Sequence, residues 1–398
     1  MMSMDSTLRV CGGPPEASDG RATSDDRVKG GDAIIRMVFR GPPDPRTLGG
    51  RMATDLVGLT LDELEAMAAG LGEPRYRGRQ LARWIYRHRA QAVSVMSDLP
   101  ETLRARLAAC ASLSRLHAVA RADAPDGYTT KFLLSLHDGR TVEAVLMRYD
   151  DGRRTACIST QVGCAMGCTF CATGLAGLER NLSAGEIVDQ VLLLAQQTGE
   201  RPTHVVFMGM GEPLANYDAT VRAVRLLNAP YGAGIAMRNL TISTVGLVPQ
   251  IRRLAQERLQ LTLAVSLHAP DDDLRSRLVP VNRRWPVADL LDAARGYAAA
   301  TRRRVTMEYV LMAGVNDRDE DARRLAGLLG GSHLHLNVIP WNPVYGLQYR
   351  RPPHVAVQRF AGLVRAAGVA VTVRVERGVE IDAACGQLRR THAAEARV

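Results

Sequence analysis

Three cysteines crowded into one short segment are the most reactive feature of this 398-residue sequence. Cys164, Cys168 and Cys171 have the spacing C-x3-C-x2-C and directly follow a predicted strand at 154–160. Thiolates are soft ligands that suit zinc and iron–sulfur clusters. Closed sites of either kind usually take four protein ligands, and this sequence offers no second C-x2-C pair and no histidine at zinc-finger spacing. Three thiolates on one loop would leave one iron of a [4Fe–4S] cube open.

An open iron can bind a small molecule and pass an electron to it. S-adenosylmethionine offers amino and carboxylate groups for chelation, and electron transfer to its sulfonium yields a 5′-deoxyadenosyl radical, chemistry that belongs to the cofactor. Gly163 and Gly167 provide the backbone freedom that a loop around a cluster needs. A structural zinc loop is the alternative that the cysteine spacing leaves open.

Alternating strands and helices must position this loop. Predicted strands centre on Ile158, Val206, Ile242, Ala264, Met307, Asn337 and Val373, and helical patterns occupy 183–198, 217–228, 247–257, 288–300, 319–329 and 354–366. This alternation predicts an α/β fold with a parallel sheet and right-handed crossovers. Periodicity does not separate a doubly wound sheet from an incomplete barrel. In both, reactive groups belong at the carboxyl ends of strands.

The segments before the α/β region predict smaller units. Residues 1–51 lack an apolar period and are predicted to be a disordered leader. Residues 52–120 carry a capping box at Thr60 and Glu63 and a basic amphipathic stretch, which predicts a helical RNA-binding accessory domain; a solvated arginine face is the plainer interpretation. Residues 121–153 predict a β-hairpin that links to the barrel, with Asp138-Gly139 at its turn. The main domain covers 154–390, and 391–398 form a tail.

The composition limits the partners and the compartment. A formal net charge of +10 favours a polyanionic partner such as nucleic acid. That inference is weakened because Lys29 and Lys131 are the only lysines, and an arginine bias also fits a GC-rich genome. No apolar stretch reaches membrane-spanning length and no secretion signal is present, so we expect a cytoplasmic protein that binds no membrane. The odd number of seven cysteines argues against a disulfide framework.

Several segments, in this order, resemble a known family over about residues 60–390. They are Ser159–Gly174, Met208–Leu214, Ser266–Pro270 and Ile381–Leu388. The chain resembles the radical S-adenosylmethionine (radical SAM) superfamily and, within it, the bacterial dual-specificity methyltransferases that act on adenine C2 in 23S ribosomal RNA and tRNA. The resemblance implies a partial (β/α)6 barrel. It also implies one [4Fe–4S] cluster per chain, held by Cys164, Cys168 and Cys171, and two S-adenosylmethionine molecules per turnover.

The same resemblance assigns residues that contact S-adenosylmethionine. They are Gly211, Glu212, Ser243, Ser266, Leu267, His268 and Asn342. The Glu212 carboxylate could accept hydrogen bonds from the cofactor's ammonium group. All of these residues follow or end predicted strands, so they could meet on one face of a barrel.

Three further residues are assigned to methyl transfer by resemblance. Cys385 first takes a methyl group, and after that carbon has bonded to adenine, Cys157 releases the RNA by forming a transient disulfide with Cys385. Glu143 matches the proton acceptor, provided that residues 147–154 contain a one-residue insertion. The chain has Arg-Gly-Val-Glu at 377–380 where the family usually has Arg-Gly-Asp-Asp, a departure that bears on loop detail or RNA contacts and not on Cys385.

The family implies 23S rRNA and tRNA as substrates, a monomer, and an electron donor such as flavodoxin or ferredoxin. Adenine C2 must be unstacked or flipped out to enter a barrel. Alternatives are a C8-adenine methyltransferase of the same superfamily and a zinc-loop RNA-binding protein. A radical enzyme acting on a peptide or small molecule is a third, but it gives no reason for the paired Cys157 and Cys385.

Overall fold

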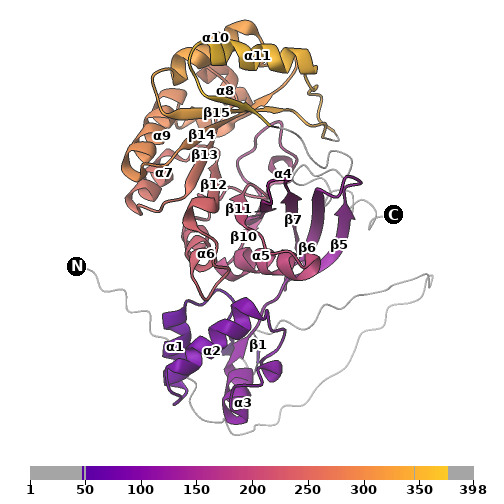
Figure 1. Cartoon of the computed structure of the whole chain (residues 1–398), viewed down its shortest axis with the longest axis vertical. Coiled ribbons are helices and arrows are strands. Elements are labelled where there is room, and N and C mark those ends of the chain that lie inside the picture. The colour runs from indigo at the N-terminus through magenta and orange to yellow at the C-terminus, as the bar shows by residue number, and fades with distance from the viewer. Residues whose placement is uncertain (1–46, 49–50, 345, 375–398) are drawn as a thin grey trace, which may run out of the picture.

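The computed structural model describes residues 47–48, 51–344 and 346–374 (Figure 1). Cys385, the predicted tail and residues 1–46 of the predicted leader lie outside the described residues. Two short strands, β1 (Thr47–Leu48) and β2 (Arg51–Met52), pair with each other before the first helical domain. No helix in the described part of the chain is long and apolar enough to cross a membrane.

A ten-stranded sheet forms the centre of the molecule, with strand order β16-β15-β14-β13-β12-β11-β8-β7-β6-β5. From β8 to β16 all neighbours are parallel, and β5 to β8 are antiparallel. The bounds are β5 His117–Asp123, β6 Thr129–Ser135, β7 Thr141–Arg148, β8 Arg154–Cys157, β11 His204–Phe207, β12 Leu240–Thr244, β13 Thr262–Ser266, β14 Val305–Leu311, β15 Leu334–Pro340 and β16 Val371–Val373. Because β5 and β16 do not pair with each other, the sheet is an open, partial barrel.

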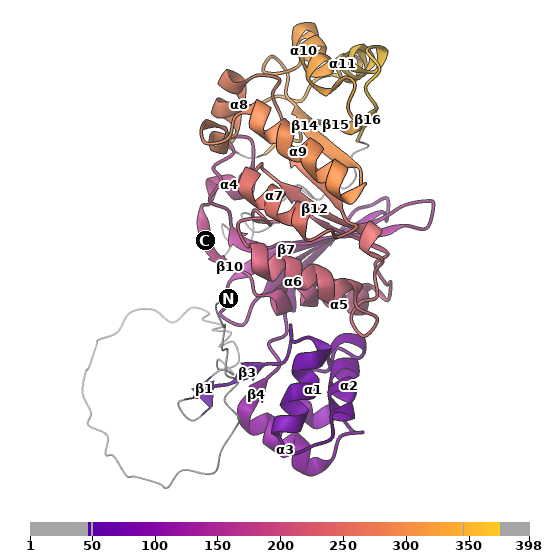
Figure 2. The ribbon, with the colours of Figure 1, turned by 90° about the vertical axis from the view of Figure 1, so that its left-hand side faces the viewer.

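Helices follow the parallel strands and cover one face of the sheet, where α5, α6, α7 and α9 run in a row in Figure 2. The bounds are α5 Ala184–Thr198, α6 Tyr217–Asn228, α7 Val248–Gln256, α8 Asp272–Leu278, α9 Val287–Thr301, α10 Asp319–Leu329 and α11 His354–Ala366. Six strand–helix units therefore run from β8 to α11, which confirms the predicted partial (β/α)6 barrel. Ser183 and Glu186 form the capping box that starts α5.

The predicted hairpin is present and extends the barrel. β6 and β7 pair around the Asp138-Gly139 turn, with Ser135 opposite Thr141. The sequence did not predict that β5 would add a third strand, or that β7 would pair with β8 and merge the hairpin into the central sheet.

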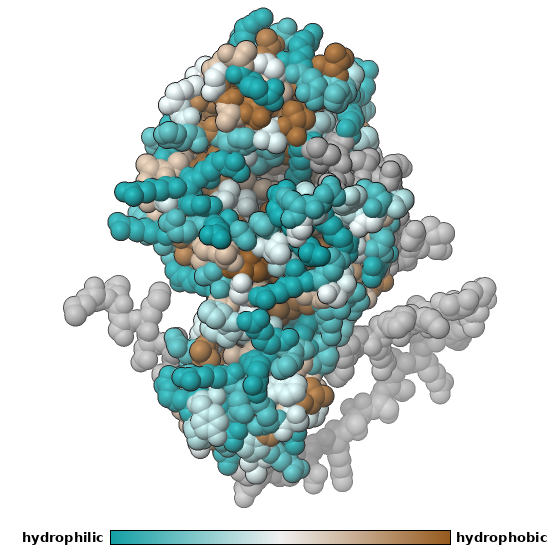
Figure 3. All heavy atoms as spheres, in the orientation of Figure 1, coloured by the Kyte–Doolittle hydropathy of each residue, from teal (hydrophilic) through white to brown (hydrophobic). Residues whose placement is uncertain are grey.

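The helical domain packs at one end of the barrel (Figure 1). It comprises α1 Leu61–Gly70, α2 Tyr76–Ala82, a π-helical turn Arg83–Arg87, a 3-10 turn Val93–Val95 and α3 Glu101–Cys110, with β3 Thr54–Asp55 beside β4 Ala111–Ser112. Thr60 starts α1 with the predicted capping box. Hydrophilic residues cover most of the face shown in Figure 3.

A buried charge cluster joins the helical domain to the barrel. Asp189 of α5 is fully buried and accepts from Arg89 (Nη2 to Oδ2, 2.7 Å), Arg115 (Nη1 to Oδ1, 2.8 Å) and the backbone N–H of Leu116 (2.9 Å). The charges of the two buried guanidinium groups are therefore compensated by the single carboxylate of Asp189. A buried ion pair that loses one partner leaves an uncompensated charge, which is more costly than the pair itself was stabilising.

We expect Asp189→Asn to lower the free energy of unfolding by about 3–5 kcal/mol, because both arginines would keep their charge in a buried position. Chemical denaturation of the full chain measures this. Asp218→Asn is the matched control, since it breaks an exposed pair with Arg253 (2.7 Å), and we expect a change below about 1 kcal/mol. Equal stability of the two variants would contradict the cluster's role.

Candidate active site

The predicted site residues on strands share the face of the sheet that the helices do not cover. In the β7–β8–β11 register Val145 pairs with Cys157, and Cys157 with Val206. These side chains and Met147 form a small hydrophobic cluster that is separate from the main core. Alternate residues of a strand point to opposite faces. Glu143 therefore lies on the same inner face as Cys157.

The same alternation places further predicted residues on this face. Ser243 of β12 pairs with Ala264 of β13, and two residues on, Ser266 pairs with Glu308 of β14. Their strand neighbours Ile242 and Val265 point into the main core instead. The inner face of the barrel is therefore lined by small or polar side chains near the carboxyl ends of β12 and β13.

The cysteine loop leaves the carboxyl end of β8 and is held by backbone contacts. β9 (Gln161–Gly163) pairs with β10 (Leu178–Asn181), and the Cys164 N–H donates to the Gly177 carbonyl at 2.8 Å. The Thr169 N–H donates to the Leu278 carbonyl at 3.1 Å, which ties the loop to the end of α8. The short helix α4 (Ala172–Leu175) begins directly after Cys171.

Side chains that follow the carboxyl ends of two other strands also contact this loop. The rings of Phe170 and His268 meet edge to face, with centroids 4.7 Å apart. The Thr169 and Tyr349 hydroxyls are 2.7 Å apart, and the Trp341 indole N–H donates to the Phe170 carbonyl at 3.4 Å. The loop thus bridges the carboxyl ends of β8, β13 and β15.

The three thiols of the loop lie close enough to influence one another. Burial raises the pKa of the Cys164 thiol to about 11, and the nearby Cys171 and Glu212 raise it further. Burial also raises the pKa of Cys168, with Cys171, Cys164 and Glu212 adding to the shift. Within the described residues no three His, Cys, Asp or Glu side chains are grouped to hold a single metal ion. Three soft thiolates on one short loop are the donor set that an iron–sulfur cluster takes; Cys164 is buried, and Cys168 and Cys171 are partly exposed.

Gly211 and Glu212 follow β11 and contact the start of the cysteine loop. Gly211 has φ +102°, and a Cβ there would lie 2.6 Å from Cβ of Gln161. The buried Glu212 carboxylate accepts from the backbone N–H groups of Val245 (2.7 Å) and Leu214 (2.9 Å). Burial raises its pKa to about 7, opposed by those hydrogen bonds. An ammonium group from a ligand would supply the positive charge that an ionised Glu212 needs.

The remaining predicted residues differ in the solvent exposure of their side chains. The Leu267 side chain is fully buried in the main core, and His268 accepts the Val310 N–H on Nδ1 at 3.0 Å. Burial lowers the pKa of His268 to about 3, with Arg275 adding to the shift, so the ring is neutral. Ser243, Ser266 and Asn342 are partly exposed, and Asn342 Oδ1 accepts from Arg351 at 3.2 Å.

Arg275 of α8 organises the site and was not predicted. It is fully buried, and its guanidinium donates to the carbonyls of Val245 (2.8 Å), Ser266 (2.8 Å) and Leu267 (3.1 Å) and to Asn282 Oδ1 (2.8 Å). Burial lowers its pKa to about 10, opposed by the neighbouring Cys168 thiol. It therefore fixes the carboxyl ends of β12 and β13 to each other. Its sequence context, a charged residue in a short helix, is typical of a solvated position.

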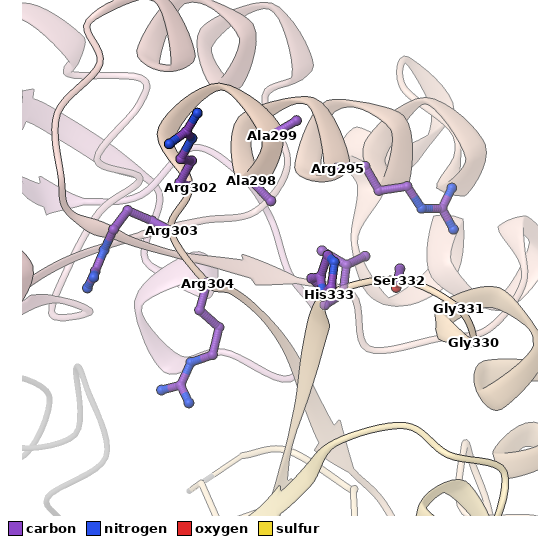
Figure 4. Close-up of a pocket in the computed structure, with 11 residues that line it drawn as sticks. Arg295, Ala298, Ala299, Arg302, Arg303, Arg304, Gly330, Gly331, Ser332 and His333 are labelled. Carbon is purple, nitrogen blue, oxygen red and sulfur yellow. The ribbon is translucent and has the colours of Figure 1, made fainter.

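A basic cavity of about 820 Å³ lies at the amino ends of β14 and β15, whereas the candidate active site lies at the carboxyl ends of the strands. No predicted site residue lines this cavity. It is formed where α9 ends and β14 and β15 begin, with Arg295, Arg302, Arg303 and Arg304 around it. In Figure 4 the Arg302 side chain points up and that of Arg295 points to the right, while those of Arg303 and Arg304 both point down and to the left. The arrangement does not converge on one anion, and the cavity lies apart from the candidate active site.

We expect Gly163→Ala to lower the iron content of the anaerobically reconstituted protein severalfold. Gly163 has φ +79°, and a Cβ there would lie 1.9 Å from the Gly177 carbonyl oxygen that positions Cys164. Gly139 also has φ +79° but nothing within 4 Å, so Gly139→Ala is a control for backbone strain alone. Iron analysis and thermal melting separate the two effects. Normal iron in the Gly163 variant would refute this role of the close contact.

Comparisons with known proteins agree with these features. Residues 158–326 match the model of the radical SAM superfamily, and residues 54–113 match that of the ribosomal RNA large subunit methyltransferase N-terminal domain. A probable dual-specificity RNA methyltransferase RlmN of Moorella thermoacetica is 52% identical over 342 residues, covering 84% of this chain and 97% of the relative. Its counterpart in Symbiobacterium thermophilum is 51% identical over 337 residues, covering 84% and 91%. The crystal structure of a radical SAM methyltransferase from Sphaerobacter thermophilus is 51% identical with a TM-score of 0.80, covering 84% of this chain and 98% of that one.

Proposed function

The chain belongs to the RlmN family of radical SAM dual-specificity RNA methyltransferases, and we propose that it methylates C2 of adenosine in 23S rRNA and tRNA. Membership of this family implies an iron–sulfur cluster, the use of S-adenosylmethionine and RNA as substrate. One observation carries the proposal. Glu143 and Cys157 lie on the same inner face of the sheet, and the cysteine loop meets Glu212 at the carboxyl ends of the strands that form this face.

Cys164, Cys168 and Cys171 would hold one [4Fe–4S] cluster per chain. Glu212, with Gly211, would receive the amino-acid part of S-adenosylmethionine, and Ser243, Ser266, Leu267, His268 and Asn342 would complete its site. Leu267 and His268 would act largely by positioning, since their side chains are buried. When bound, the cluster and S-adenosylmethionine supply a 5′-deoxyadenosyl radical. Two molecules of S-adenosylmethionine are used per turnover, one as the methyl donor.

The protein's own residues would handle the methyl group and the proton. Cys385 would take the methyl group, which then gives one hydrogen atom to the adenosyl radical and stays attached to the sulfur while its carbon bonds to adenine C2. Glu143 would accept the proton that C2 loses, and the unpaired electron of the adduct would return to the oxidised cluster. The Cys157 sulfur then bonds to the Cys385 sulfur, the bond from that sulfur to the new carbon breaks, and the carbon takes up a proton. This sequence requires Glu143 and Cys157 to face the same space, as their strand positions indicate.

The substrate adenosine must leave its stack to enter the barrel. The helical domain at 52–120 and the arginine-rich surface would bind the surrounding RNA fold. A small reductant protein such as flavodoxin or ferredoxin would supply the electron. We expect a monomer that works in the cytoplasm.

Nucleoside mass spectrometry tests the target atom. RNA lacking the modification is incubated anaerobically with reconstituted protein, S-adenosylmethionine and reductant, and then digested to nucleosides. We expect 2-methyladenosine in both 23S rRNA and tRNA. The appearance of 8-methyladenosine would instead establish the C8 specificity, and the absence of any methylated adenosine would refute the proposed function.

A further inference from the structure

Lys131 is completely buried beside the proposed proton acceptor. Its Nζ lies 3.1 Å from Oε2 of Glu143, and the two side chains are 0% and 3% exposed. Lys131 is one of only two lysines in the chain, and the other, Lys29, lies outside the described residues. In every other ion pair of the described residues the cation is therefore arginine or histidine. This chain uses arginine almost everywhere for its positive charges, and Lys131 is an exception.

The strand register explains how the pair meets. Lys131 of β6 lies opposite Val145, and Leu133 lies opposite Glu143 of β7, so the two charged residues are diagonal neighbours on the inner face. Val145 in turn pairs with Cys157. Lys131, Glu143 and Cys157 thus occupy successive strands on the side of the sheet that receives the substrate in the proposed function.

Stability alone is a weak reason for such a pair. Replacing a buried ion pair by apolar residues of similar size is often neutral or stabilising. An ionised carboxylate in a buried position, however, needs a compensating charge. An ammonium is a compact charge with three rotatable donors, which lets it hold a carboxylate without filling the space in front of it as a planar guanidinium would.

We propose that Lys131 is a positioning residue that keeps Glu143 ionised and oriented as the proton acceptor for adenine C2, a role that rests on the proposed function of Glu143. In that step the C2–H bond breaks, the proton passes to a Glu143 carboxylate oxygen and the bonding electron pair stays in the purine ring, while the single unpaired electron of the adduct would pass to the oxidised iron–sulfur cluster of the proposed function. Lys131 keeps its own proton throughout. Methylation of Cys385 comes earlier and needs neither residue.

The test compares Lys131→Met, Lys131→Arg and Glu143→Gln in the full-length reconstituted protein. We expect Lys131→Met and Glu143→Gln to slow 2-methyladenosine formation by about 100-fold or more, the usual contribution of a general base. The KM for RNA and the methylation of Cys385, read as a 14-Da gain on its peptide, should stay within about twofold of wild type, because the lost step follows both. Lys131→Arg should recover part of the rate, since it restores the charge.

Arg121→Met is the control, because it removes an exposed ion pair with Asp123 on the adjacent strand β5. A Lys131→Met protein that methylates RNA at the wild-type rate overturns the proposal. Loss of Cys385 methylation in both lysine variants, together with a lower melting temperature, also overturns it and makes the pair structural. Normal activity of Glu143→Gln refutes the role of Glu143 itself, whereas an inactive wild-type protein refutes the proposed function.

Discussion

The Cys157→Ala protein is expected to accumulate covalently bound to its RNA substrate. Cys157 lies on the inner face of β8, between its register partners Val145 of β7 and Val206 of β11, where its sulfur can face the space that receives adenine. Without this sulfur nothing attacks Cys385, so the bond between Cys385 and the new methyl carbon persists. We expect release of 2-methyladenosine to fall by about 100-fold or more, with one RNA linked per active chain.

Denaturing gel electrophoresis of radiolabelled RNA measures the adduct. Thr155→Ala is the matched control, because Thr155 is also buried, lies on the same strand and shares the inner face, but carries no thiol. The additional variant Cys157→Ala/Cys385→Ala should form no adduct, since the attachment point is gone. Multiple turnovers by Cys157→Ala without any adduct would exclude Cys157 as the resolving thiol.

The Cys168→Ala protein is expected to lose its cluster and all radical chemistry. Cys168 lies between Cys164 and Cys171 on one short loop, and both of the other thiols contribute to raising its pKa. Two thiolates cannot replace three at an open cluster, so iron content should fall to background and RNA methylation by at least about 1,000-fold. Cys385 should also remain unmethylated, because without the cluster the site that binds S-adenosylmethionine is not assembled.

Iron and sulfide analysis after anaerobic reconstitution measures this effect. Cys110→Ala is the control, because Cys110 ends α3 in the helical domain, far along the chain from the loop. Full iron content and activity in Cys168→Ala would mean that the cluster has another ligand set.

The individual strands and helices could be predicted because each carries its own signal. The capping box at Ser183 and Glu186 marks the start of α5, and the apolar runs centred on Ile242 and Met307 lie within β12 and β14. The choice between a doubly wound sheet and a partial barrel could not be made from such signals. It depends on helices covering one face only and on β7 pairing with β8, which are long-range features.

In the candidate site, too, local sequence signals predicted some residues, whereas residues buried by long-range contacts were missed. Cys164 was predicted from the cysteine spacing, and Glu212 and Ser266 were predicted from segments that resemble a family. Strand alternation explains why several predicted residues share a face. Arg275 and Lys131 were missed because a charged residue in a short polar helix, or next to an apolar run, is usually solvated. Their burial arises from distant partners, namely the carbonyls at the ends of β12 and β13 for Arg275 and the Glu143 carboxylate for Lys131.

The central claim is that the methyl group passes through a protein sulfur and loses a hydrogen there before it bonds to adenine. S-adenosylmethionine carrying a trideuterated methyl group tests it directly, with protein whose Cys385 starts unmethylated. One deuterium is removed while the group is on Cys385, and solvent supplies the hydrogen that replaces it when the RNA is released. We therefore predict 2-methyladenosine with two deuterium atoms in its methyl group, whereas a product that retains all three would show direct transfer and contradict this account.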